Sequence, residues 1–379
     1  MKKFTVAIVT AALSLSLLTG CGNGGTGNES SSAQEASSEE TQETNLEAAQ
    51  QEDTNEETGE SEEQNASKTQ ETQEQEEDSD ASLPTVRVMA LKGPTAMGMV
   101  QLMDAAEGQE SYEFTLAASP DEVTPKLVQG EIDIAAVPAN LSSVLYNNTG
   151  GQIQVLAVNT LGVLYIVENG DSIQSVSDLT GKTIYASGKS STPEYALNHI
   201  LSENGIDPQK DVTIEWKAEH SECVAAISSK EGGIAMLPQP FVTTAQLKNE
   251  SIRTALDLTH EWESLQKDGE TSSAMITGVV AVRSDFAVQY PEAVSAFLDA
   301  YQESVEYVNA NTQEASALIE KYDIVPAAVA SKALPYCNIT FIEGEEMKEK
   351  LSGYLEVLFN QNPKAVGGTL PAEDFYFIR

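Results

Sequence analysis

The fold is indicated most clearly by a short apolar stretch, IDIAAVPAN, at residues 132–140. An uninterrupted apolar run that ends at proline is typical of a buried strand. A similar stretch, GIAMLPQP, stands at residues 233–240. Before each stretch, the expected order is strand, polar turn with a glycine, helix, strand and helix. Strands that alternate with helices predict parallel sheets, so this repetition predicts two similar α/β lobes, although any α/β chain shows some repetition.

The first unit contains the turn ALKGPTAMGMV, residues 90–100, between an expected strand and an expected helix. Gly93 and Gly98 have the spacing of a phosphate-binding P-loop. That loop also requires Lys and then Ser or Thr after its last glycine, because they complete the phosphate and magnesium contacts. Met99 and Val100 stand there instead, so the sequence argues against an NTPase. Two roles remain for the turn: Gly93 as a plain turn glycine with Thr95 as a helix cap, or both as part of a ligand site.

The second unit contains the turn SGKSSTPE, residues 187–194, between an expected strand at 182–186 and an expected helix. Free backbone amides and the helix dipole favour an anion or a polar ligand group at such a helix start. The hydroxyls of this turn are also good helix caps, and Pro193 suits the first helical position. Both roles stay open, and we expect at least one of the hydroxyls to contact ligand.

Two further segments predict how the lobes are joined. Strands follow each other without an intervening helix in QIQVLAVNT and GVLYIVE, and MITGVVAVRSDF, residues 275–286, predicts a long strand that returns to the first unit. Crossings near 158–167 and 277–282 then divide the folded part into lobe 1, residues 85–166 and 279–379, and lobe 2, residues 167–278. The predicted fold class is α/β, with two Rossmann-like lobes, a central cleft and two crossover strands.

The first 20 residues predict export. A short basic start, MKK, precedes an apolar stretch that is too short for a comfortable membrane span, and LTGC follows at residues 18–21. This pattern resembles a bacterial lipoprotein signal peptide, which implies that Cys21 is lipidated and becomes the mature N-terminus. Two acyl chains suffice for stable anchoring at a membrane surface. The alternative is an ordinary secretory signal with an incidental cysteine.

An acidic linker is expected from Cys21 to residue 84. Between residues 22 and 84 the sequence holds 19 of the chain's 59 Asp and Glu residues, one basic residue, Lys68, and no aromatic residue. Such a composition buries too little apolar area to offset the entropy of ordering, so we expect disorder. Repulsion between the charges extends the segment, which favours a spacer, although an acidic interaction tail is the alternative.

The remaining residues, 85–379, are numerous enough for two lobes with their own cores. The whole chain has a formal net charge of −38, so nucleic acid is an improbable partner. Cys223 and Cys337 are far apart in sequence, and the sequence leaves open whether they form a disulfide or remain free thiols. The sequence does not predict oligomeric state.

The sequence offers little support for an enzyme. Only His199, His220 and His260 occur, none of them in a metal-binding spacing, and no G-x-S-x-G nucleophile turn is present. The segment AEHSEC, residues 218–223, places His220 near Cys223, but its position at a helix start favours ordinary surface polarity. We expect no cofactor and no metal. Tyr185 and Trp216 are suited to stacking on a planar ligand, but such side chains more often pack in the core.

The folded part resembles a known family, the lipoprotein substrate-binding proteins of ABC importers with the type II periplasmic-binding fold, in the group that includes nitrate, sulfonate, bicarbonate and thiamine-precursor binders. The residues that carry the resemblance are LTGC, VRVMALKGPTAMGM, LVQGEIDIAAVP, VSDLTGKTIYA and GGIAMLPQPF. One departure is Gln239, where many relatives have an acidic residue before the Pro-Phe pair.

The resemblance implies a small organic ligand, such as a sulfonate or a pyrimidine-like thiamine precursor, and partner subunits, the ABC permease and ATPase. It also implies an extracytoplasmic, lipid-anchored location. A ligand sensor or surface lipoprotein without transport is the alternative, and an enzyme that converts a precursor is less favoured. The implied ligand-binding residues are Lys92, Gly93, Pro94, Thr95, Ala96, Met97, Pro138, Asn140, Thr160, Ser187, Gly188, Lys189, Ser190, Ser191, Thr192, Gln239 and Pro240.

Overall fold

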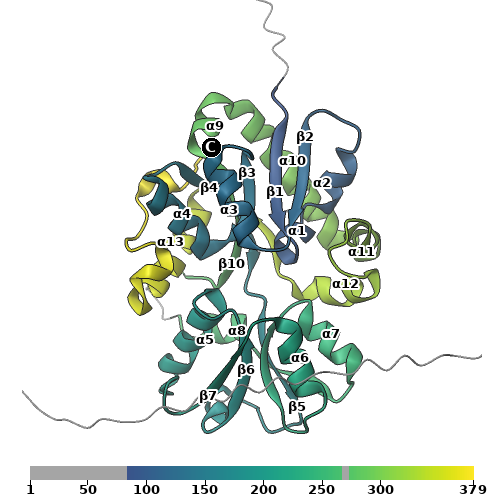
Figure 1. Ribbon diagram of the computed structural model, residues 1–379, viewed down its shortest axis with the longest axis vertical. Coiled ribbons are helices and arrows are strands. Elements are labelled where there is room, and N and C mark those ends of the chain that lie inside the picture. Colours follow the sequence, from purple (N-terminus) through teal and green to yellow (C-terminus); the bar gives the residue numbers. More distant parts are fainter. Residues whose placement is uncertain (1–82, 267–272) are drawn as a thin grey trace, which may run out of the picture. The chain divides into compact units, whose positions relative to one another are not determined.

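The computed structural model describes residues 83–266 and 273–379, which form two β-sheets covered by helices (Figure 1). The predicted signal peptide, Cys21 and nearly all of the predicted acidic linker lie outside the described residues. Strands and helices alternate along most of the chain, as the repeated pattern predicts.

The first sheet has six strands in the order β11-β4-β10-β3-β1-β2. β1 is parallel to both β2 and β3, whereas β10 runs antiparallel to β3 and β4, and β11 runs antiparallel to β4. The strands are β1 (Val86–Leu91), β2 (Tyr112–Ala117), β3 (Ile134–Pro138), β4 (Ile153–Leu161), β10 (Ile276–Arg283) and β11 (Ile339–Ile342).

The second sheet has five strands in the order β7-β6-β8-β5-β9. β6 is parallel to β7 and β8, and β5 runs antiparallel to β8 and β9. The strands are β5 (Leu164–Asn169), β6 (Thr183–Ser187), β7 (Thr213–Lys217), β8 (Ile234–Pro238) and β9 (Ile252–Asp257).

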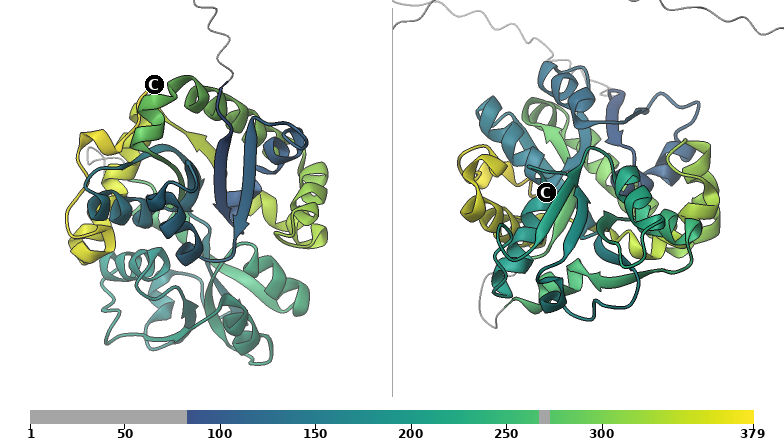
Figure 2. Two further views of the ribbon diagram at one scale, coloured as in Figure 1. Left: turned by 45° about the horizontal axis from the view of Figure 1, so that its top comes forward. Right: turned by 60° about the horizontal axis from the view of Figure 1, so that its bottom comes forward.

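Helices cover both faces of each sheet. Those that belong to the first sheet are α1 (Pro94–Met97), α2 (Val100–Ala105), α3 (Pro120–Gln129), α4 (Ala139–Thr149), α9 (Ser284–Gln289), α10 (Pro291–Ala310), α11 (Thr312–Lys321), α12 (Ala327–Ala333) and α13 (Gly344–Gln361). Those of the second sheet are α5 (Thr192–Glu203), α6 (His220–Ser228), α7 (Phe241–Lys248) and α8 (Leu258–Ser264). Short 3₁₀ turns lie at Val176–Leu179, Leu334–Tyr336, Pro363–Val366 and Glu373–Phe375. The C-terminal helix α13 packs beside α4, as the further views also show (Figure 2).

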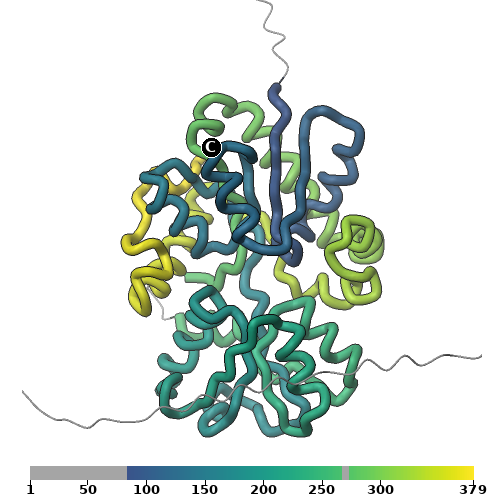
Figure 3. The backbone as a smooth tube through the Cα atoms, in the orientation of Figure 1, coloured from purple at the N-terminus to yellow at the C-terminus, as the bar shows by residue number. Residues whose placement is uncertain are grey.

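The chain passes from one sheet to the other at two places (Figure 3). It leaves the first sheet after Leu161, at the end of β4, and enters the second at Leu164, at the start of β5. It returns after α8 and re-enters the first sheet at Ile276, the start of β10. The predicted lobe boundary at 166/167 therefore falls within β5, and the one at 278/279 falls within β10. The first switch lies within the crossing expected near 158–167, whereas the second ends before the crossing expected near 277–282.

The core forms three clusters. One packs on the α3, α4 and α13 side of the first sheet and continues to α5 and α8. Another lies on the opposite face of the first sheet under α2, α10, α11 and α12, and the third lies under α6 and α7. β3 and β8 are buried along their first four residues, because helices cover both of their faces.

The serines that precede α3 and α5 do not cap these helices through their side chains. Ser119 precedes α3 and Ser191 precedes α5, but neither side chain bonds to the helix amides. Glu122 instead accepts a hydrogen bond from the amide of Ala118 at 3.2 Å. Gly130 ends α3 at φ 74°, as expected for a left-handed helix cap.

Candidate functional site

The predicted site residues follow strands whose carboxyl ends face one edge of each sheet. β1 and β3 run in the same direction in the first sheet, and β6 and β8 do so in the second. The turn at Lys92 and Gly93 follows β1, Asn140 follows β3, the turn at residues 188–191 follows β6, and Gln239 follows β8. In open α/β sheets, ligands bind at this edge.

The first turn has a backbone that favours glycine. Gly93 is the N-cap residue of α1, with φ 129° and ψ −160°, and no heavy atom lies within 4 Å of the position that a Cβ would take. Lys92 is on the surface, where its ammonium forms an ion pair with Asp323 at 2.8 Å. Ala96 and Met97 are completely buried in the core. Pro94 is the first residue of α1. Proline has no amide hydrogen, and at this position of a helix that hydrogen would have no partner within the helix.

Thr95 and Thr160 come together through a residue that the sequence did not single out, Asn159. The Asn159 amide nitrogen donates to the Thr95 carbonyl at 3.2 Å, and its oxygen accepts from the Thr160 hydroxyl at 3.1 Å. Asn159 and Thr160 are fully buried. Thr95 itself donates from its hydroxyl to the Leu91 carbonyl at 2.9 Å, so both threonine hydroxyl protons are already engaged.

The second turn places a histidine against Ser187. The Ser187 hydroxyl lies 2.5 Å from Nδ1 of His220, the first residue of α6, and the His220 ring packs on Phe241 with centroids 4.9 Å apart. Burial lowers the pKa of His220 to about 4, because it disfavours the charged imidazolium. His220 is therefore neutral at pH 7, so at the carboxyl ends of β6 and β8 it can form hydrogen bonds but adds no positive charge.

The other residues of the second turn are partly bonded among themselves. Ser191 donates to the Gly188 carbonyl at 2.7 Å, and the Ser190 amide donates to the Glu194 carboxylate at 2.6 Å. Ser190 has a positive φ of 63°. Lys189 is exposed at the start of the turn.

Asn140 and Thr192 connect the two sheets directly. Thr192 stands at the start of α5, and its hydroxyl donates to the side-chain oxygen of Asn140 at 3.3 Å. Both residues are buried, and the Asn140 amide nitrogen also donates to the Ala365 carbonyl at 3.3 Å. Two site residues predicted for different lobes therefore meet in one place.

The remaining predicted residues end the third strand of each unit. Pro138 ends β3, and Gln239 and Pro240, joined by a cis peptide bond, follow β8. The Gln239 side-chain oxygen accepts from both the amide and the hydroxyl of Thr243, at 3.3 and 2.9 Å. Gln239 is buried, so this oxygen is fully engaged within its own helix start.

The aromatic and thiol groups considered from the sequence are engaged in core packing or in contacts with lysine side chains. Trp216 packs against the core, and Tyr185 lies beneath the ammonium groups of Lys217 and Lys230 at 5.2 and 5.3 Å. Cys223 and Cys337 are free thiols, both completely buried. Burial raises the pKa of Cys223 to about 11, so it does not supply a thiolate beside His220.

A family model matches most of the folded region. Its description is ABC transporter, phosphonate, periplasmic substrate-binding protein, and it matches residues 99–333. The chain belongs to this family. Its members are the substrate-binding components of ABC import systems, they act outside the cytoplasm, and they bind their substrates for a permease. Binding proteins of this kind are not enzymes.

Solved structures share the fold of this substrate-binding protein. An ABC transporter protein from Parabacteroides distasonis is 23% identical with a TM-score of 0.66, covering 78% of this chain and 99% of that chain. The periplasmic aliphatic sulphonate binding protein SsuA from Escherichia coli is 18% identical with a TM-score of 0.62, covering 78% and 92%. A ligand-binding component of an ABC-type import system from Staphylococcus aureus, solved with zinc bound, is 15% identical with a TM-score of 0.58, covering 78% and 96%. No curated protein matches the sequence significantly.

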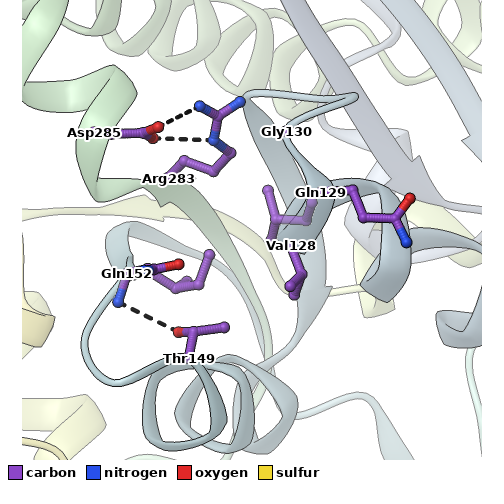
Figure 4. Close-up of a pocket in the computed structure, with 9 residues that line it drawn as sticks. Val128, Gln129, Gly130, Thr149, Gln152, Arg283 and Asp285 are labelled. Atoms are coloured by element: carbon purple, nitrogen blue, oxygen red, sulfur yellow. Dashed lines mark hydrogen bonds and ion pairs between the residues drawn. The ribbon is translucent and has the colours of Figure 1, made fainter.

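A separate pocket of the binding protein lies at the opposite end of the first sheet (Figure 4). It encloses about 240 Å³ between the ends of α3 and α4 and the end of β10. Arg283 lies in it, with its guanidinium bonded to Asp285 and, at 3.5 Å, to Asp133. Because Arg283 is already paired with carboxylates, this pocket has no free cation to offer an anionic ligand.

Within residues 83–266 and 273–379, no group of three or more His, Cys, Asp or Glu side chains is placed to hold a metal ion. No helix in that part of the chain has the length and apolar character needed to span a bilayer.

From the sequence, His220 is considered only beside Cys223 for a Cys-His site, and Asn159 is not singled out. His220 follows β7, which is parallel to β6, so its place at the same sheet edge was a usable signal. Asn159 directly follows the apolar run VLAV, residues 155–158, and a buried amide requires hydrogen-bond partners. The identity of those partners depends on the tertiary structure.

Proposed function

We propose that this protein captures a small, singly charged organic oxyanion of the sulfonate or phosphonate type and presents it to an ABC permease. The observation that carries the proposal is the hydrogen bond between Asn140 and Thr192, because it brings polar groups from both sheets to one place. A solute-binding site between two lobes requires such a meeting, since the ligand must contact both.

The charge preference rests on the basic groups of the predicted turns. Lys92 is already paired with Asp323, and His220 is neutral at pH 7, which leaves the exposed Lys189. A ligand here would be held mainly by hydroxyls, amides and one ammonium. A sulfonate or a phosphonate monoanion suits these donors, whereas a dianion would require more compensating charge.

The family description and the fold support this ligand class. The family model names phosphonate, and the structural relative from Escherichia coli binds aliphatic sulphonates. The same class of ligand would suit the hydroxyl-rich second turn, Ser187 to Thr192. The residues proposed to contact ligand are the sequence-predicted ones other than the fully buried Ala96, Met97 and Thr160, together with His220.

Isothermal titration with ethanesulfonate and ethylphosphonate tests the ligand class. Ethanesulfonate keeps one charge at pH 6 and pH 8, whereas ethylphosphonate gains a second as pH rises. We expect measurable binding of both at pH 6 and a loss of affinity for the phosphonate alone at pH 8. If neither compound binds but a pyrimidine thiamine precursor raises the melting temperature, the ligand class is pyrimidine-like instead. No thermal shift with any of the three would contradict capture of these solutes, since a bound ligand at a hundredfold excess over Kd adds about 2.7 kcal/mol.

We also propose that Cys21 carries the lipid that anchors the protein at the outer face of the cell membrane. The support is the LTGC sequence after an apolar stretch. Cells fed a labelled palmitate should yield labelled protein in the membrane fraction, and Cys21→Ser should yield unlabelled protein outside it. Label that remains on the Cys21→Ser protein would show that the lipid is elsewhere.

A further inference from the structure

Asn159 interrupts a buried apolar run in β4. The four residues before it in β4, Val155 to Val158, are completely buried and apolar, and Asn159 is completely buried as well. A buried amide costs free energy unless its polar atoms are bonded, so an apolar residue of similar size would serve simple packing better. Its presence there points to a positional role.

The bonds of Asn159 join two parts of the first wall of the proposed site, by which we mean residues 92–97 and Thr160. Its nitrogen donates to the Thr95 carbonyl in α1, and its oxygen accepts from the Thr160 hydroxyl on its own strand. The short helix α1 has only four residues and begins at the glycine-dependent conformation of Gly93, so it has little stability of its own. The amide of Asn159 therefore supplies an external attachment for the turn.

Gly278 closes the same cluster from β10. A Cβ at this position would lie 2.6 Å from Asn159 Oδ1 and 3.2 Å from Thr160 Oγ1, and it would overlap Thr95 Cγ2. The backbone of β10 can approach the cluster closely only because residue 278 has no side chain. Asn159 and Gly278 thus fix the turn from two neighbouring strands.

We propose that Asn159 is the positioning residue of the first wall, and that it holds the turn at Gly93 to Met97 in the conformation that receives ligand. The proposal rests on the proposed function for its link to binding. Asn159 is completely buried, so it acts through Thr95 and Thr160. Loss of the Asn159 side chain would weaken ligand binding by more than the loss of folding stability explains. The reason is that ligand binding would then also have to supply the free energy that orders the turn.

The test compares Asn159→Leu with Asn169→Leu. Asn169 is also buried at the end of a strand, and its amide donates to a helix carbonyl, that of Ile227, at 3.0 Å in the second sheet. Ethanesulfonate is the titration probe. We expect Asn159→Leu to raise Kd at least tenfold and Asn169→Leu to leave it within twofold, at similar losses of thermal stability. Equal changes of Kd in the two variants would overturn the proposal.

A second measurement does not depend on ligand. Hydrogen exchange in the ligand-free protein should accelerate at the amides of Ala96 and Met97 in Asn159→Leu and not in Asn169→Leu. If wild type binds neither ethanesulfonate nor ethylphosphonate, the proposed ligand class fails, and this exchange result alone decides the role of Asn159. Unchanged exchange at these amides would overturn the role. Gly278→Ala, whose Cβ would press on both Asn159 Oδ1 and Thr95 Cγ2, should reproduce both effects if Asn159→Leu does not fold.

Discussion

At the scale of single residues, Gly93 shows how a backbone conformation limits the choice of side chain. Its φ of 129° and ψ of −160° lie in a region that is nearly restricted to glycine, although a Cβ would meet nothing within 4 Å. The requirement for glycine is therefore conformational, and no steric contact with a neighbouring group imposes it.

We expect Gly93→Ala to lower the free energy of unfolding by about 2–3 kcal/mol. Gly150→Ala is the matched control, since Gly150 also has open space for a Cβ but lies in the ordinary left-handed region at φ 67° and ψ 40°. That control should lose about 1 kcal/mol. Urea unfolding of the two variants measures the difference, and equal losses would show that the backbone of Gly93 is not strained by alanine.

His220 predicts a pH dependence of stability. Its pKa is lowered to about 4 in the folded protein from an ordinary value of 6.5, so between these values the unfolded chain binds more protons. The contribution is fully present above pH 6.5 and is lost as pH falls toward 4, at up to about 1.4 kcal/mol per pH unit. His220→Gln should remove this component of the slope in urea unfolding at pH 4.5 to 7, and an unchanged slope would contradict the lowered pKa.

At the scale of elements, the crossing between β4 and β5 is packed more tightly than a simple linker. Gly162 lies between the two strands, and a Cβ there would overlap Thr259 Oγ1 and Met275 Cε, which flank the second crossing. The Asn338 amide holds this crossing by donating to the Gly162 carbonyl at 2.5 Å. The two crossings are thus in contact with each other.

We expect Gly162→Ala to cost about 1–3 kcal/mol of stability through this overlap. Adding Thr259→Ala removes one of the overlapping groups, so the double variant should lose less than the sum of the two single losses. A double-mutant cycle by thermal unfolding measures the coupling. Strict additivity would mean that the backbone, rather than Thr259, accommodates the new methyl group.

At the scale of the whole folded region, four side-chain hydrogen bonds join elements of the two sheets. Besides the bond from Thr192 to Asn140, the Tyr165 hydroxyl donates to the Tyr336 carbonyl at 3.0 Å. The side-chain amides of Gln361 and Asn362 donate to the carbonyl and the hydroxyl of Tyr195, at 3.0 and 3.2 Å. Each is an uncharged hydrogen bond with a net value of about 1 kcal/mol, so the set can be broken at modest cost. Such contacts suit lobes that must open to admit a ligand.

Thr192→Val should therefore broaden the distribution of distances between the lobes in the ligand-free protein. Spin labels at cysteines introduced for the exposed Glu113 and Glu215 report this distance, and the native Cys223 and Cys337 are buried away from the label. Thr213→Val, at an exposed position of β7, is the control and should leave the distribution unchanged. Identical distributions for Thr192→Val and wild type would show that the contact with Asn140 does not hold the lobes together.

The sequence by itself determined the α/β class, the two-lobe repetition, most strands and helices, and the turns that hold Gly93 and Ser187. These follow from hydrophobic periodicity and from glycine and proline, which act over a few neighbouring residues. The tertiary structure alone decided where the chain changes sheets, that Asn140 meets Thr192, that Lys92 pairs with Asp323, and that His220 and Asn159 join the turns. Those contacts join residues tens to hundreds of positions apart, and local pattern carries no record of which distant group will satisfy a buried polar atom.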